Sequence, residues 1–122
     1  MFTGANAFSA FAVTDIPAAK TFYAQTLGLD VSEENGMLRI RSTGGAEVLA
    51  YPKPDHEPAT YTILNCPVED IDAAVEELSA RGVSFERYPG FEQDDKGVMR
   101  AGGLLIAWFT DPCGNILSVL NP

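Results

Sequence analysis

Two stretches of the chain share one pattern of apolar and polar positions. In each, a short apolar run (residues 8–13 and 61–66) precedes an aspartate and a series of apolar residues at helical spacing. Segments 13–20 and 68–75 lie 55 residues apart and are identical at five of their eight positions. We therefore predict that the chain contains two copies of one structural module.

Each copy carries the start and stop signals of a helix. Asp15 and Asp70 are predicted N-caps, because a carboxylate there accepts hydrogen bonds from the free N–H groups of the first turn. Gly28 and Gly82 stand where a left-handed residue commonly follows a helix. The apolar residues between these signals predict one buried face on each helix.

Strand-like runs follow each predicted helix. They are residues 29–32, 37–41 and 47–51 in the first copy, and 83–87, 104–109 and 116–120 in the second. Residues 89–103 are predicted to form a long acidic loop, of the kind that often serves as a lid or partner contact but also occurs as a plain insertion.

These elements predict an α+β fold built from two tandem β-α-β-β-β modules. The first module spans about 6–52 and the second about 60–121, with a proline-containing linker at about 52–59. A length of 122 residues indicates a single domain.

Charge and composition narrow the class of protein. The formal net charge is −9 and the eight basic residues are scattered, which argues against a nucleic-acid partner. An acidic field favours a cationic ligand, although solubility is the simpler explanation of the negative charge.

The absence of a long apolar run and of a secretory signal predicts a cytoplasmic protein with no membrane partner. Cys66 and Cys113 are expected to be reduced.

The chain carries several motifs in a fixed order and spacing: residues 13–16 with Phe22-Tyr23 and Leu27-Gly28-Leu29, residues 68–71, and the segment Phe109–Asn115. Together they resemble the motifs of the vicinal oxygen chelate superfamily, which includes glyoxalase I, extradiol dioxygenases, and the fosfomycin and bleomycin resistance proteins. Phe109–Asn115 is similar to that family's F-x-D-P-x-G-N hairpin. The resemblance implies that the two modules form a cup-shaped mixed sheet, and that the protein is a homodimer. The motifs say little about chemistry, because one fold supports many reactions.

Metal-dependent relatives place a ligand on the first and last strand of each module. Mapped through the motifs, these positions hold Phe8, Leu49, Ile63 and Ser118. None offers the imidazole or carboxylate that divalent cations need, so no metal site and no cofactor are predicted. His56, the only histidine, lies between Asp55 and Glu57 and could bind metal weakly, but a solvated linker is the favoured interpretation.

Alternation along the strands shows which side chains share a face with those four positions. The predicted face is mostly apolar with a few polar groups, which suits a small-molecule pocket and also suits a partly filled core. Trp108 could stack on a flat ligand, although packing in the core is favoured. The candidate ligand-binding residues are Phe8, Glu47, Leu49, Tyr51, Tyr61, Ile63, Asn65, Trp108 and Ser118.

Three functions remain open from the sequence. The preferred prediction is a small-molecule binding protein similar to the bleomycin resistance proteins, which lacks the family metal site and sequesters a cationic or aromatic compound. The second is a metal-dependent lyase or dioxygenase of the same superfamily, which the missing ligands disfavour. The third is a structural domain whose cup is filled by its own side chains. No catalytic residue is assigned, and the question of enzymatic activity stays open with a preference for none.

Overall fold

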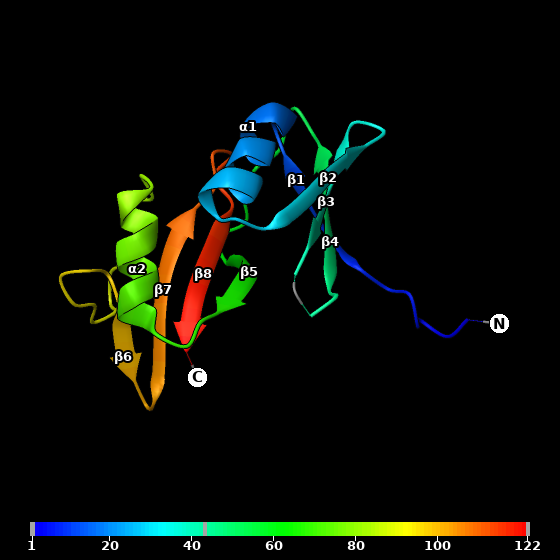
Figure 1. Ribbon diagram of the computed structural model, residues 1–122. Coiled ribbons are helices and arrows are strands. Elements are labelled where there is room, and N and C mark those ends of the chain that lie inside the picture. Colours follow the sequence, from blue (N-terminus) through cyan, green and yellow to red (C-terminus); the bar gives the residue numbers. More distant parts are fainter. Residues whose placement is uncertain (1, 43, 122) are drawn as a thin grey trace. The chain divides into compact units, whose positions relative to one another are not determined.

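A computed structural model describes residues 2–42 and 44–121 (Figure 1). The chain divides into two compact units, Met1–His56 and Glu57–Pro122. The first unit contains β1 (Ser9–Val13), α1 (Ile16–Thr21), the π-helix η1 (Phe22–Thr26), β2 (Asp30–Glu34), β3 (Met37–Arg41) and β4 (Glu47–Pro52). The second contains β5 (Thr62–Pro67), α2 (Ile71–Ala80), β6 (Met99–Ala101), β7 (Leu104–Thr110) and β8 (Ile116–Asn121).

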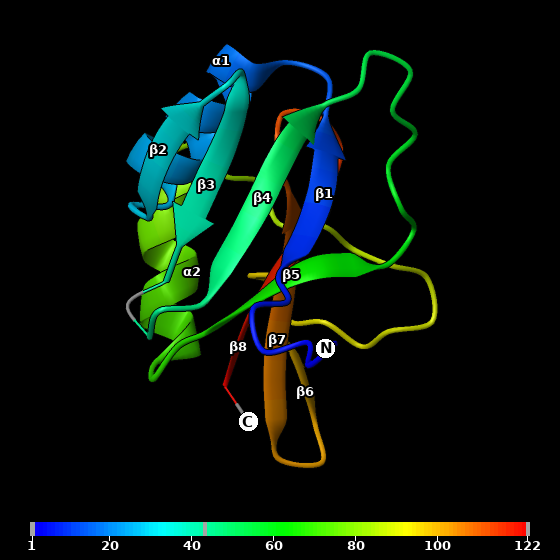
Figure 2. The same ribbon diagram turned by 90° about the vertical axis from the view of Figure 1, so that its right-hand side faces the viewer.

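Both units have the same sheet topology. The strand order is β1-β4-β3-β2 in the first unit, seen in Figure 2, and β5-β8-β7-β6 in the second. In each sheet the first strand pairs in parallel with the last one, and the other neighbours are antiparallel. The two mixed sheets, each with its helix, confirm the predicted α+β fold of two β-α-β-β-β modules.

The predicted helix signals are present in both units. The carboxylates of Asp15 and Asp70 each accept a hydrogen bond, at 3.0 Å, from the backbone N–H three residues later. Gly28 and Gly82 follow the helical segments with φ values of 73° and 95°. The first helix widens at its end into η1, which the sequence pattern did not predict; this turn carries Tyr23, whose buried ring lies 5.6 Å from that of Phe11.

We expect Asp70→Ala to lower the free energy of unfolding by about 1 kcal/mol, because the N–H of Ala73 loses its capping partner. Urea denaturation followed by circular dichroism measures this change. Asp70→Ser, which keeps a capping oxygen, should recover most of the loss, and an equal loss in both variants would contradict the capping role.

The predicted strand 83–87 is wrong. Within it, only Phe85 bridges to β7, at Phe109, and the N–H of Glu86 donates to the carbonyl of Trp108. The chain then leaves the sheet, because the N–H of Tyr88 is bonded instead to the side chain of Gln93 and the next residue, Pro89, has no N–H.

The edge of the second sheet is formed instead by β6, inside the segment 89–103 that was predicted to be a loop. Gly102 and Gly103, with φ values of 59° and 85°, connect β6 to β7. Two successive residues at positive φ are typical of a two-residue hairpin turn with the right twist, so this glycine pair is the signal that sequence reasoning missed.

Alternation along the strands gives each sheet two different faces. In the first unit, Leu38, Ile40 and Ala50 are buried on one face. In the second unit, Phe109 and Leu117 are fully buried on one face, and Trp108 and Ser118 lie next to them in sequence and on the other. This second face carries the candidate site.

Candidate ligand pocket

A pocket of about 400 Å³ lies within the second unit. It brings together the segment before β5, the loop that leads from α2 toward β6, and strands β7 and β8. None of its lining side chains carries a charge. They are Thr60, Tyr61, Thr62, Tyr88, Phe91, Trp108 and Ile116.

Three aromatic rings form one wall of this pocket. The ring of Phe91 is stacked on that of Trp108, with centroids 5.4 Å apart and planes inclined by 26°. Tyr88 meets Trp108 edge-on at 5.5 Å. Trp108 is only 8% exposed, whereas Phe91 is 49% and Tyr61 is 70% exposed. The pocket therefore has a buried indole below and exposed rings at its rim, a surface suited to apolar and flat groups.

The side chain of Tyr88 also carries a buried polar group, its hydroxyl. Its oxygen is buried and forms no hydrogen bond to any other described residue. Burial raises the pKa of Tyr88, and the nearby negative charge of Glu86 raises it further, so the hydroxyl stays protonated at neutral pH. A buried donor without a partner costs about 1–3 kcal/mol.

The predicted site residues of the second unit fall into two groups. Tyr61 and Trp108 line the pocket. Ser118, which pairs with Trp108 across β7 and β8, is fully buried and its hydroxyl donates to Asn65 Oδ1 at 2.6 Å. Ile63 is half-buried at an irregularity of β5, between Thr62 and Leu64, and does not line the pocket.

Sequence reasoning missed Tyr88 and Phe91. It assigned the region to the end of a strand and the start of a loop, whereas the structure folds both rings onto Trp108. The signal in the sequence was the run Tyr88-Pro89-Gly90-Phe91, in which two aromatic residues flank a turn dipeptide.

The remaining candidates belong to the first unit and do not line this pocket. Phe8 precedes β1 and is 65% exposed, and Leu49 and Tyr51 follow Glu47 at alternate positions along β4. The carboxylate of Glu47 is 2.5 Å from Arg39 Nη1 and 4.0 Å from Arg41 Nε. Glu47 is therefore paired with two arginines of the neighbouring strand β3.

The donor chemistry at the four mapped metal-ligand positions does not fit a divalent cation. Phe8, Leu49 and Ile63 offer no donor atom, and the hydroxyl of Ser118 is already bonded to Asn65. Among residues 2–42 and 44–121, no three His, Cys, Asp or Glu side chains come together as a metal-binding group. In the linker, the carboxylate of Asp55 is paired with Lys53 at 2.7 Å.

Comparison with known proteins places the chain in a family. Residues 7–119 match the family model of the Glyoxalase/Bleomycin resistance protein/Dioxygenase superfamily, and the chain belongs to that superfamily. No curated protein matches it significantly by sequence. Within the described residues, no helix is long and apolar enough to cross a membrane.

Solved structures share the fold over the full length of the chain. A superfamily member from Sphaerobacter thermophilus has a TM-score of 0.72 and 22% identity, with 98% of this chain and 100% of that one covered. The glyoxalase family protein from Enterococcus faecalis gives 0.70 and 22%, with 99% and 100% covered. TnmS3, an antibiotic binding protein from Streptomyces sp. CB03234, gives 0.67 and 22%, with 99% of each chain covered. These similarities confirm the fold predicted from the sequence.

Proposed function

We propose that this protein binds a flat, partly aromatic small molecule in the pocket of the second unit, without the help of a metal ion. The observation that carries the proposal is the aromatic wall formed by Tyr88, Phe91 and Trp108 beside a space of about 400 Å³. The structural similarity to TnmS3, named as an antibiotic binding protein, supports the same class of function.

The chemistry of the pocket favours a cationic or neutral ring system over an anionic one. Aromatic faces attract cations as well as other rings, and each ring pair contributes about 0.5–1.5 kcal/mol beyond its buried area. The net charge of −9 adds a long-range attraction for cations and a repulsion for anions. The volume lies within the usual range for small-molecule sites.

The two alternatives have less support. A metal-dependent lyase or dioxygenase needs imidazole or carboxylate ligands, and the mapped positions do not supply them. A purely structural domain would not account for the 49% exposure of the Phe91 ring or for the buried Tyr88 hydroxyl, which bonds to no other described residue. On the family resemblance we also propose a cytoplasmic homodimer; a monomer at micromolar concentration in analytical ultracentrifugation would contradict the dimer.

Three tricyclic aromatic probes of similar size test the proposal: cationic proflavine, neutral acridone and anionic anthracene-9-carboxylate. We expect saturable binding in isothermal titration calorimetry and a rise in melting temperature, with proflavine tightest and the anion weakest. If no probe binds saturably or shifts the melting temperature at millimolar concentration, the binding proposal is wrong.

We expect Tyr61→Ala and Phe91→Ala each to raise the Kd for proflavine about 5- to 10-fold, because each removes an exposed ring from the rim. Their melting temperatures should change little, since neither ring is buried. Phe2→Ala is the matched control, because Phe2 is equally apolar, 94% exposed and outside the pocket. An equal loss of affinity in the control would show that proflavine binds elsewhere.

A further inference from the structure

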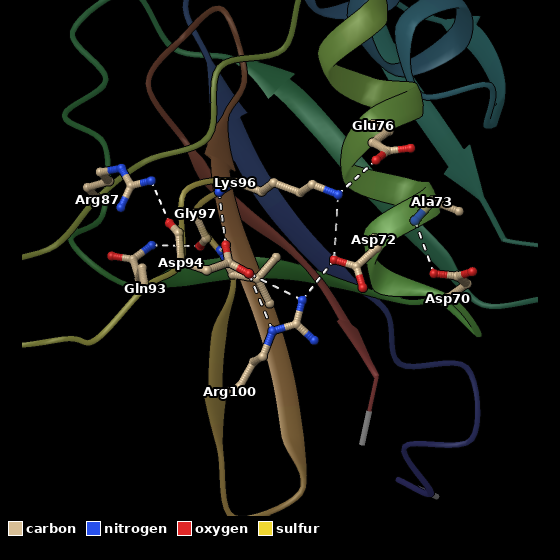
Figure 3. A network of polar contacts seen from close by, with 11 residues as sticks. Asp70, Asp72, Ala73, Glu76, Arg87, Gln93, Asp94, Lys96, Gly97 and Arg100 are labelled. Carbon is tan, nitrogen blue, oxygen red and sulfur yellow. Dashed lines mark hydrogen bonds and ion pairs between the residues drawn. The ribbon is translucent and has the colours of Figure 1, made fainter.

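One loop, residues 84–98, carries both Tyr88 and Phe91. Polar contacts within this loop close it on itself, and several of them are drawn in Figure 3. The side chain of Gln93 spans its interior: Oε1 accepts from the N–H of Tyr88 at 2.9 Å, and Nε2 donates to the carbonyls of Glu86 and Gly97 at 2.9 and 2.7 Å. The backbone that presents Tyr88 is therefore bonded directly to the middle of the loop.

Asp94 lies at the centre of the same network, because both its side chain and its backbone carbonyl accept hydrogen bonds. Its Oδ1 accepts from the N–H groups of Lys96 and Val98, both at 2.9 Å, and its Oδ2 accepts from Arg100 Nη2 at 3.2 Å. Its backbone carbonyl accepts from Arg87 Nη2 at 2.6 Å. One residue thus joins the two sides of the loop to β6.

The network continues to helix α2, as Figure 3 shows. Arg100 Nη2 lies 2.8 Å from Asp72 Oδ1, and Lys96 Nζ lies 2.7 Å from Glu76 Oε1. Between this helix and the loop there is a cavity of about 540 Å³, with Val75 and Ser79 on one side and Phe85 and Gly97 on the other. The polar contacts therefore link the loop region to the helix beside a space that apolar packing does not fill.

We propose that Asp94 is a positioning residue for the ligand pocket: it fixes the loop that carries Tyr88 and Phe91 against Trp108, and ties that loop through Arg100 to Asp72 of helix α2. The expected effect of Asp94 on ligand affinity rests on the proposed function. Its expected effect on the packing of the loop against Trp108 can be measured without a ligand.

The Asp94 carboxylate is ionised at neutral pH, when it forms these contacts. Burial acts to raise the pKa of Asp94, but hydrogen bonds from the N–H groups of Val98 and Lys96 and the adjacent Arg100 outweigh it, and the pKa is lowered overall. A single exposed ion pair contributes little to stability. Asp94 differs because its one side chain also satisfies two backbone donors, so its loss releases several contacts together.

The test uses Trp108, the only tryptophan, as a reporter. Without ligand, acrylamide should quench the fluorescence of Asp94→Ala about two- to threefold more strongly than that of the wild type, because the variant has no side-chain acceptor and the loop opens locally. Asp95→Ala is the matched control, since it makes the same chemical change in the exposed neighbour. Arg100→Gln, which breaks the link to Asp72 and leaves the backbone bonds of Asp94 intact, should show a smaller increase of the same kind.

Proflavine binding separates this proposal from the proposed function. Increased quenching together with an unchanged far-ultraviolet spectrum and an increase in Kd of about 5- to 10-fold supports both. Increased quenching with no probe binding even to the wild type supports the positioning role and overturns the proposed function. Quenching equal to that of Asp95→Ala in both the Asp94 and Arg100 variants overturns the positioning role.

Discussion

Asp111→Ala should lower the free energy of unfolding by about 3–5 kcal/mol. The side chain is 4% exposed, and its carboxylate accepts hydrogen bonds from the N–H groups of Cys113 and Asn115 and from Asn115 Nδ2, at 2.8–2.9 Å. Alanine removes the acceptor of all three bonds, and Asn115 is itself buried. Urea denaturation followed by circular dichroism measures the loss.

Asp111→Asn is the control for this prediction, because it keeps the shape and one acceptor oxygen of the side chain. We expect it to lose about half as much stability as alanine does. A loss for alanine below 1 kcal/mol would show that the hairpin 111–115 does not depend on this carboxylate.

The same hairpin also matters for the pocket. Gly114 has a φ of 86°, and a Cβ atom placed there would lie 2.8 Å from Pro58 Cγ. The close approach of Pro58 to the hairpin fixes the start of the segment that brings Thr60 and Tyr61 to the pocket. An intact hairpin is therefore needed both for stability and for the rim of the candidate site.

Trp108→Ala should raise the Kd of proflavine about 10- to 100-fold, because it removes the indole that forms the buried base of the aromatic wall. The variant should also lose roughly 3–5 kcal/mol of stability, as is usual when a buried aromatic residue is truncated. Binding is therefore measured by calorimetry, at a temperature where circular dichroism shows the variant to be folded.

Two further variants separate lost contacts from lost stability. Trp108→Phe keeps a ring at the base of the pocket and should recover most of the affinity. Phe109→Leu weakens the core on the opposite face of the same strand, where the side chain is fully buried and outside the pocket. If Phe109→Leu reduced the affinity as much as Trp108→Ala did, the site would not be the pocket described above.

The elements that the sequence predicted correctly depend on local interactions. The capping bonds of Asp15 and Asp70 join residues three apart, and the hairpin 111–115 closes on its own aspartate. Alternation of side chains along each strand is equally local, because it follows from the regular period of the backbone. Because these features need only neighbouring residues and a regular period, they can be read from the order of amino acids.

The aromatic wall depends on contacts that no local pattern contains. The apolar and polar alternation of residues 83–87 suits a strand, but the side chain of Gln93 and the missing N–H of Pro89 turn the chain away from the sheet. Tyr88 and Phe91 then meet Trp108, which lies about 20 residues further on, and Asn65 meets Ser118 across two strands. The sequence determined the two modules and their helices, while the path of one loop over the sheet, set by side-chain contacts distant in sequence, decided which residues form the pocket.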